Sequence, residues 1–180
     1  MTTLKGERRR FSLLARPHPG NENDKADLQR KPDPACRQGY RIPRLRSNLN
    51  LHPDVNDPVQ RLAIAMEPAS YVRIHRHPHT WEVLASLAGR FVVLIYNSEG
   101  EVTERVVLGE EAQVVEIPAG IWHSALSLDS GSAFFELKQG PYVPVPEEDT
   151  FPGSPAEGDE RANDIMAWYA TAKVGDKISF

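Results

Sequence analysis

Between residues 61 and 138 the chain repeats one pattern, in which a short run rich in β-branched and aromatic residues is followed by a turn signal. No stretch of helical period interrupts the series, so it predicts an antiparallel sandwich or small barrel. Asn97-Ser98-Glu99-Gly100 and Asp129-Ser130-Gly131 are typical of hairpin turns. The expected strands are 61–66, 71–76, 81–87, 90–96, 102–108, 113–117, 123–128 and 133–138.

The length and composition indicate a single core with extensions. The 180 residues are 40% hydrophobic, which suits one globular domain, and they include 15 prolines, many of them outside the strand-like runs. Residues 1–44 are polar and proline-rich without a sustained apolar period, which predicts a disordered N-terminal tail. We therefore expect a tail at 1–44, a barrel at 45–142 and a C-terminal extension at 143–180.

The C-terminal extension carries one helical pattern. Ala162, Ile165, Met166 and Tyr169 recur at the spacing of a single helix face, which predicts one amphipathic helix. Such an apolar face packs against the barrel or against a second subunit.

Charge and cysteine content restrict the partners and the compartment. A net charge of −4 argues against general binding to nucleic acid or to anionic membranes. The one cysteine, Cys36, has no partner for an internal disulfide, which favours a reducing compartment. No apolar run approaches the ~20 residues of a membrane span. The prediction is a cytoplasmic protein.

Two histidines lie two residues apart in an expected strand. His75 and His77 would then project from the same face. Pro78 cannot donate to a β-ladder, so the chain is expected to turn there and to bring Glu82 back beside the histidines. A single histidine on a half-apolar strand is more often a hydrogen-bonded structural residue than a ligand, and the His-x-His pair alone is a weak signal.

A second motif supplies a further histidine. Pro118 and Gly120 predict a tight turn from which His123 opens the next strand. Three imidazoles and one carboxylate suit a borderline divalent ion such as Fe, Mn, Ni, Cu or Zn, with positions left open for water or substrate. The predicted ligands of one divalent metal ion are His75, His77, Glu82 and His123.

Strand alternation also indicates polar residues near the metal. Arg73 shares the expected face of His75 and His77, and Glu136 lies on a face that either meets solvent or lines a polar cavity. Asn48, Asn50 and His52 alternate with leucines before Pro53 and form a polar row. This row would contact a polar ligand such as a sugar, or else it reflects ordinary turn chemistry. The predicted substrate-binding residues are Arg73, Asn48, Asn50, His52 and Glu136.

The two motifs resemble the paired signatures of the cupin superfamily. HRHPHTWEVLASLAG is similar to the first signature and GEEAQVVEIPAGIWHSALS to the second, with His75, His77, Glu82 and His123 on the metal-ligand positions. Ala69 and Ser127 depart from the usual residues, and the gap between Gly109 and Pro118 is longer than usual. The resemblance implies an all-β fold, the cupin-type double-stranded β-helix or jelly-roll barrel, here with a C-terminal helix.

Residues 45–178 further resemble the WbuC-type single-domain cupins. RSNLNLHPDVNDPVQRLAIAMEP, LKQGPYVP and FPGSPAEGDERANDIMAWYATAKVGD carry this similarity. WbuC-type cupins are small bacterial proteins often associated with O-antigen gene clusters. Many cupins pair through strand edges and C-terminal extensions, which leaves a homodimer open.

The leading functional hypothesis is a metal-dependent enzyme acting on a small polar substrate. The resemblance suggests a sugar or nucleotide-sugar of surface-polysaccharide, or lipopolysaccharide, biosynthesis, with isomerisation or epimerisation as the first guess at the reaction. One alternative is a non-enzymatic carbohydrate-binding or sensing module whose metal is structural. Another is an Fe(II)-dependent oxygenase, which requires two adjacent open positions on the metal.

Overall fold

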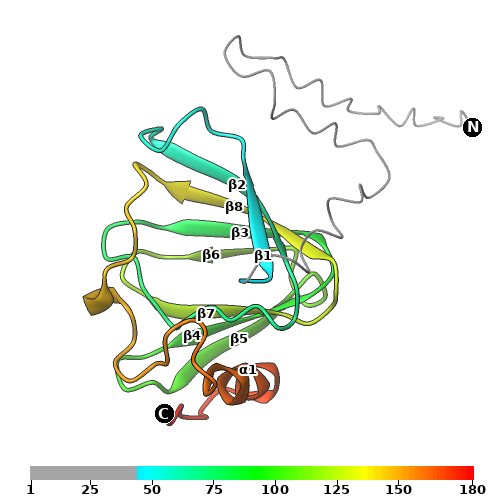
Figure 1. Cartoon of the computed structure of the whole chain (residues 1–180), viewed down its shortest axis with the longest axis vertical. Coiled ribbons are helices and arrows are strands. Elements are labelled where there is room, and N and C mark those ends of the chain that lie inside the picture. The colour runs from blue at the N-terminus through cyan, green and yellow to red at the C-terminus, as the bar shows by residue number, and fades with distance from the viewer. Residues whose placement is uncertain (1–43) are drawn as a thin grey trace, which may run out of the picture. The chain divides into compact units, whose positions relative to one another are not determined.

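The structure is a computed structural model that describes residues 44–180. Within them the chain forms two antiparallel β-sheets and a C-terminal helix (Figure 1). The prediction of an all-β jelly-roll barrel with a C-terminal helix is confirmed. The predicted disordered tail lies outside the described residues apart from Arg44, and the division into a barrel at 45–142 and an extension at 143–180 stays a prediction.

The larger sheet has five strands in the order β1-β2-β8-β3-β6. The strands are β1 (Arg46–Asn50), β2 (Val59–Met66), β8 (Ser132–Gln139), β3 (Glu82–Ala88) and β6 (Val114–Ile117). Residues directly opposite each other in an antiparallel pair project from the same face. Asn50, Leu62, Glu136 and Leu84 are opposite one another in turn across β1, β2, β8 and β3, so they form one row on one face.

The smaller sheet has three strands in the order β5-β4-β7. Its strands are β4 (Phe91–Tyr96), β5 (Val102–Leu108) and β7 (Trp122–Ser127). The central strand β4 reads FVVLIY without alternation because both of its faces are covered. Phe91 and Val93 belong to the core between the sheets, whereas Val92 and Leu94 belong to a second core under the helix.

Apolar side chains from both sheets fill the space between them. The rings of Phe91 and Phe134 meet edge-on with centroids 5.0 Å apart, joining the smaller sheet to the larger one. Each fully buried side chain of this size contributes about 1.5–3 kcal/mol to folding. The buried residues of this core are Met66, Leu84, Phe91, Val93, Leu108, Ile117 and Phe134.

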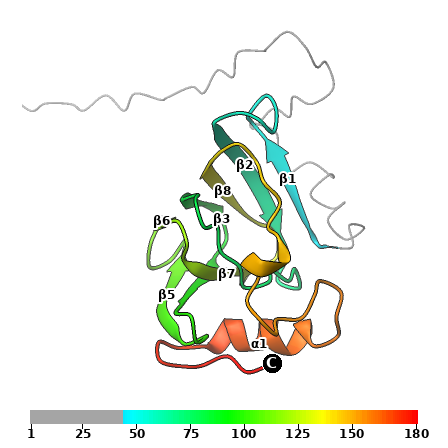
Figure 2. The same ribbon diagram turned by 90° about the vertical axis from the view of Figure 1, so that its left-hand side faces the viewer.

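Helix α1 (Ala162–Thr171) covers the outer face of the smaller sheet (Figure 2). Ala162, Ile165 and Tyr169 are buried in the core that they form with β4 and β7. Tyr169 is fully buried and its hydroxyl donates to the Val72 carbonyl at 3.2 Å. The predicted apolar helix face therefore packs against the barrel of the same chain. No helix within residues 44–180 is long and apolar enough to cross a membrane.

Seven of the eight predicted strands are present, each within two residues of its predicted bounds. The predicted strand at 71–76 is wrong as a regular strand, because only His75 forms β-bridges there, with His123 and with Thr150. This extended segment lies between β7 on one side and the loop around Asp149 on the other, so neither side offers a continuous ladder. Strand β1 was not among the predicted strands.

The residues after β8 pass back across the barrel before helix α1. We call residues 141–157 the C-terminal strap; it includes the short 3-10 helix η2 (Glu147–Asp149). Four ion pairs hold it against the rest of the described chain: Arg73 with Glu147 at 3.0 Å, Arg76 with Asp149 at 2.9 Å, and Glu157 with Arg44 at 2.6 Å and with Arg46 at 2.5 Å.

Candidate metal centre

Backbone hydrogen bonds bring the two histidine motifs together. The amide of His75 donates to the carbonyl of His123 at 3.0 Å, and the amide of His123 donates to the carbonyl of His75 at 2.9 Å. Gly120, whose φ of +81° suits glycine, donates its amide to the carbonyl of His77 at 2.8 Å. The turn predicted at Pro118-Ala119-Gly120 thus joins the second motif directly to the first.

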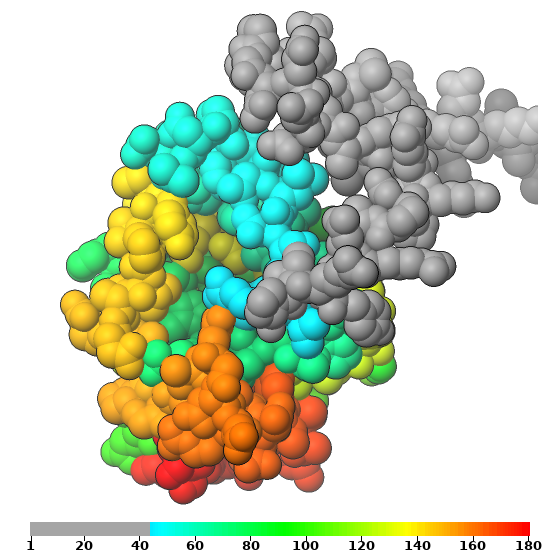
Figure 3. All heavy atoms as spheres, in the orientation of Figure 1, coloured from blue at the N-terminus to red at the C-terminus, as the bar shows by residue number. Residues whose placement is uncertain are grey.

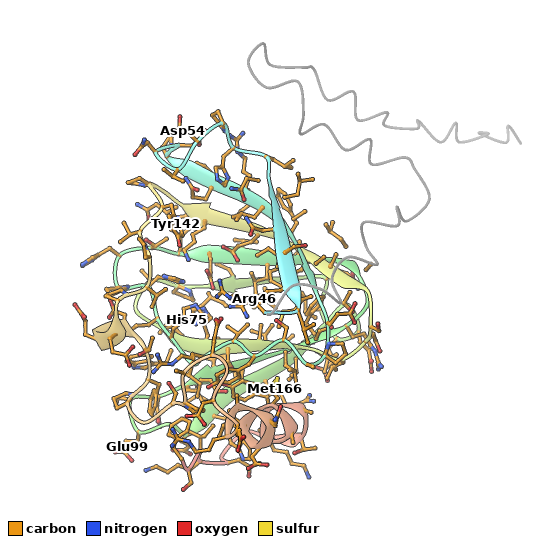
Figure 4. All side chains as sticks on the ribbon, in the orientation of Figure 1. Arg46, Asp54, His75, Glu99, Tyr142 and Met166 are labelled. Atoms are coloured by element: carbon orange, nitrogen blue, oxygen red, sulfur yellow. The ribbon has the colours of Figure 1, made fainter. Side chains whose placement is uncertain are left out.

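The three imidazoles converge, because the ring centroid of His123 lies 4.3 Å from that of His75 and 5.7 Å from that of His77. His75 is labelled in Figure 4. One ligand atom from each of His75, His77 and His123 lies within 4.8 Å of the other two, a cluster that fits a single metal ion. His123 is only 3% exposed and His77 9%. The structure therefore brings together three of the four predicted ligands as one compact group.

Two of the histidines are held in a fixed tautomer. Nδ1 of His75 lies 2.9 Å from the carbonyl oxygen of Arg73, and Nδ1 of His123 lies 2.9 Å from that of Ile121. A carbonyl only accepts, so each Nδ1–H is the donor and the lone pair of the neutral ring is on Nε2. This is the outer hydrogen bond that orients metal-binding histidines in proteins.

Glu82 is buried, with 4% of its surface exposed, and contacts two of the imidazoles. Its carboxylate lies 2.7 Å from Nε2 of His123 and 3.6 Å from Nε2 of His77. Burial alone would raise the pKa of Glu82, but the nearby positive charges of His123 and Lys138 outweigh it, so its pKa lies below the ordinary value. Glu82 is therefore an anion at the edge of the histidine cluster.

The contact between His123 and Glu82 tests whether a metal ion fits. Nε2 of His123 is buried and has no hydrogen-bond partner within residues 44–180, yet a carboxylate oxygen lies 2.7 Å away. Two acceptor atoms at this distance repel each other unless a cation, either a proton or a metal ion, lies between or beside them. The donor set of imidazole nitrogens and one carboxylate is one that divalent metals prefer, so the residues fit a metal ion.

His75 and His77 are in the neutral form that a metal requires, whereas Glu82 favours the charged form of His123. Burial lowers the pKa of His75 well below its ordinary value, and the neighbouring His123 adds to the effect. Burial and the ammonium of Lys138 together lower the pKa of His77 to about 4. Burial lowers the pKa of His123, but the Glu82 carboxylate raises it by more than burial lowers it. The net shift is therefore upward.

The cluster faces a cavity of about 530 Å³, which we call the metal cavity. Apolar side chains line part of it, including Ile64, Leu84 and Phe134, while the C-terminal strap contributes Tyr142 and Glu147. In Figure 3, β1 and the strap border a hollow whose base is formed by the middle of the chain. A cavity of this size admits a small organic substrate.

Two of the predicted substrate-binding residues line the metal cavity. Arg73 lies in its wall, where its guanidinium binds both carboxylate oxygens of Glu147 at 3.0 Å and the Ser154 carbonyl at 2.9 Å. Glu136 lies on the inner face of β8. Burial, reinforced by the charge of Glu82, raises the pKa of Glu136 to about 7.

The other three predicted residues line a second hollow. Asn48, Asn50 and His52 border a space of about 360 Å³ beside β1, which we call the β1 hollow. The side chains of Asn48 and Asn50 hydrogen-bond to each other, and the Nδ1 atom of His52 accepts from the Arg61 amide at 3.0 Å. The β1 hollow shares four lining residues with the metal cavity: Arg44, Arg46, Ile64 and Tyr142.

Sequence reasoning did not assign Lys138 to the site. Its ammonium lies 2.6 Å from Nε2 of His77 and 3.4 Å from a carboxylate oxygen of Glu82. Its position two residues after Glu136 on β8 was the available signal, because both then project from the same face. The strap residues were also missed, since their long-range pairs leave no local pattern.

One family model and several solved structures are similar to parts of the chain. Residues 29–108 match the family model of a domain of unknown function, DUF6016, which is less than half of the chain. No curated protein matches the chain. Similar solved structures include KdgF from Halomonas sp., at 19% identity and a TM-score of 0.40 over 54% of this chain and 80% of that one.

Two further structures are similar at the same level. A Bacillus subtilis oxalate decarboxylase studied for its Mn(II) centres matches at 19% identity and a TM-score of 0.40, over 52% of this chain and 24% of that one. The Schizosaccharomyces pombe Cnp3 cupin domain matches at 11% identity and a TM-score of 0.41, over 52% and 64% of the two chains. The fold of the described residues is the two-sheet barrel given above, and the histidines of the two motifs converge inside it.

Proposed function

We propose that the chain is a metal-dependent cupin enzyme that acts on a small polar substrate. One divalent ion is bound by His75, His77, Glu82 and His123. The observation that carries this proposal is the convergence of His75, His77 and His123, which place one ligand atom each within 4.8 Å of one another beside the carboxylate of Glu82. The adjoining cavity leaves room for substrate.

The metal supplies a Lewis acid or an activated water when bound. Glu136 is the residue that we assign to proton transfer, because it lines the metal cavity and a carboxyl group with a pKa of about 7 both gives and takes protons near neutral pH. Arg73 orients the strap side of the cavity through Glu147. A residue that holds and returns a proton suits isomerisation or epimerisation, our first choice of reaction.

The substrate we propose is a sugar or nucleotide-sugar of surface-polysaccharide (O-antigen) biosynthesis, as the WbuC-type resemblance suggests. The register supports a polar substrate, because Asn48 and Asn50 share the inner face of the sheet with Glu136. A substrate that binds at the metal is thereby able to extend along one face into the β1 hollow. A cytoplasmic location and a homodimer belong to the same proposal.

Metal identification followed by a ligand screen tests this function. We expect protein purified without added metal to contain one Fe, Mn, Zn or Ni per chain, and Mn²⁺ belongs in the reconstitution panel. A nucleotide-sugar that binds the folded protein should raise its melting temperature, and turnover should require Glu136. The Glu136→Gln variant should bind metal and ligand but lose turnover by ~100-fold or more. Turnover at the wild-type rate in this variant would remove Glu136 from the mechanism.

A structural metal is the second candidate, because the cluster joins separate segments of the chain. His75 bridges to both His123 on β7 and Thr150 of the strap. A metal at this point would tie β7 and the strap to the first motif and stabilise the fold by its own binding free energy. If removal of the metal unfolds the protein and no ligand of the panel is turned over, the carbohydrate-binding module with a structural metal is the better account.

A further inference from the structure

Lys138 is the cation closest to the proposed metal ligands. Its side chain is 16% exposed, and its ammonium contacts Nε2 of His77 and the carboxylate of Glu82. The register places it there, since Lys138 is directly opposite Glu82 across β8 and β3. In the metal-free protein this ammonium therefore compensates the charge of Glu82 and donates to His77.

Metal binding would weaken both contacts of Lys138. A metal ion held by His77 and Glu82 would compete with Lys138 for the lone pair of His77 Nε2 and would offset the charge of Glu82. The ammonium would then face a partly apolar cavity with weaker compensation from these two groups, and an uncompensated charge in such a place is costly.

The other cations of the metal cavity are already paired. Arg73 binds Glu147 through both of its terminal nitrogens, and Arg44 and Arg46 both bind Glu157. Lys138 alone among the basic residues lining this cavity pairs with proposed metal ligands. It is therefore the cation that metal loading makes available to an incoming anion.

We propose that Lys138 and the bound metal together form a two-point site for a carboxylate group, so that the sugar substrate proposed above is a sugar acid. This inference rests on the proposed metal site. The metal held by these residues would bind one carboxylate oxygen, and the other oxygen would accept from the ammonium of Lys138, a charge-assisted hydrogen bond. Lys138 is thus a specificity-determining residue that selects acids over their neutral analogues.

The same arrangement makes Lys138 a competitor of the metal. An ammonium beside two ligands repels a divalent cation and occupies a lone pair that the metal needs. Replacing Lys138 by methionine keeps the length of the side chain and removes the charge. The Lys138→Met variant should therefore bind metal at least threefold more tightly than the wild type.

The test uses the full chain loaded with Co²⁺, whose visible spectrum reports changes in its coordination. Acetate is titrated against acetamide, which has nearly the same shape without the charge. We expect acetate to change the spectrum of the wild type, acetamide to act at least tenfold more weakly, and Lys138→Met to lose at least tenfold in acetate affinity. Lys138→Arg should keep part of the affinity, and Lys173→Met, on the exposed surface, should behave as the wild type.

The two proposals fail in different ways. If Co²⁺ does not bind to the wild type, the metal site itself is wrong. If Co²⁺ binds but acetate binds equally well to the wild type and to Lys138→Met, or if acetate does not bind to the loaded wild type, the carboxylate site is wrong and the metal site stands. Thermal unfolding of each variant checks that it folds, and Lys138→Arg supplies the comparison if Lys138→Met does not.

Discussion

The metal cavity and the β1 hollow share a sheet face but differ in how their side chains are held. In the metal cavity, His75 and His123 are fixed by reciprocal backbone bonds and by carbonyl acceptors on their rings. In the β1 hollow, Asn48 and Asn50 are exposed and bond chiefly to each other. The side chains of the first region are held in one geometry, whereas those of the second are exposed. In the function proposed above, the first region binds the ion and the second contacts the substrate.

The largest expected effect is on metal affinity, which should depend on the metal cavity and not on the β1 hollow. We expect His75→Ala and His123→Ala each to lower metal affinity by about 100-fold or more, since loss of even an outer-shell partner of a metal ligand lowers affinity 10–100-fold. Asn48→Ala should leave it unchanged. Titration of the metal-free variants with Zn²⁺ measures this, and equal losses in Asn48→Ala would show that the two regions are not distinct.

The pH dependence of the metal-free protein comes next. Because the pKa of His77 falls from 6.5 to about 4 on folding, the unfolded chain binds more protons between these values. The folded state should therefore lose stability as the pH falls from 6.5 to 4, with about 2 kcal/mol of the loss due to His77.

Urea unfolding of the metal-free protein at both pH values measures this loss. The His77→Gln variant should lose correspondingly less stability than the wild type over this range. His79→Gln is the matched control, because His79 is exposed. An identical pH dependence in wild type and His77→Gln would contradict the buried, neutral state of His77.

The wall of the metal cavity gives a smaller effect. Arg73→Met removes the bonds to Glu147 and to Ser154, and we expect a loss of about 1 kcal/mol because Glu147 is 80% exposed and its ion pair is screened. Arg161→Met, which removes a local exposed pair, should change the free energy of unfolding by less. Chemical denaturation measures both; a larger loss in Arg161→Met would show that Arg73 does not hold the strap.

The smallest effect belongs to the β1 hollow. Asn48→Ala and Asn50→Ala should each weaken binding of the nucleotide-sugar found in the screen by about two- to tenfold, the worth of one neutral hydrogen bond. Metal affinity should not change. Titration calorimetry measures this, and unchanged sugar affinity in both variants would assign the β1 hollow to structure alone.

The convergence of the three histidines was easier to predict from the sequence than their surroundings, for a physical reason. The spacing from His75 to Glu82 and the turn before His123 are local, and hydrogen bonds between the two motifs complete the cluster. The predicted strand at 71–76 was nevertheless wrong, because its neighbours are the strap and a single bridge to β7.

The walls of the site depend on pairs far apart in the chain. Arg73 meets Glu147 across 74 residues, and Lys138 meets His77 across 61. Whether Glu136 and Lys138 face solvent or the cavity depends on which strands flank β8, and no local pattern of β8 contains that information. Once the strand order is known, the alternation of side chains along β8 places Glu136 and Lys138 on the face that lines the metal cavity.

Direct titration of the metal-free protein with a divalent ion is the most direct test of the central claim. The account predicts that the wild type binds one ion per chain and that His123→Ala loses this binding. His123 is the proposed ligand whose Nε2 is buried without a hydrogen-bond partner within residues 44–180. Wild-type protein that binds no ion, or His123→Ala that binds as tightly as the wild type, would contradict it.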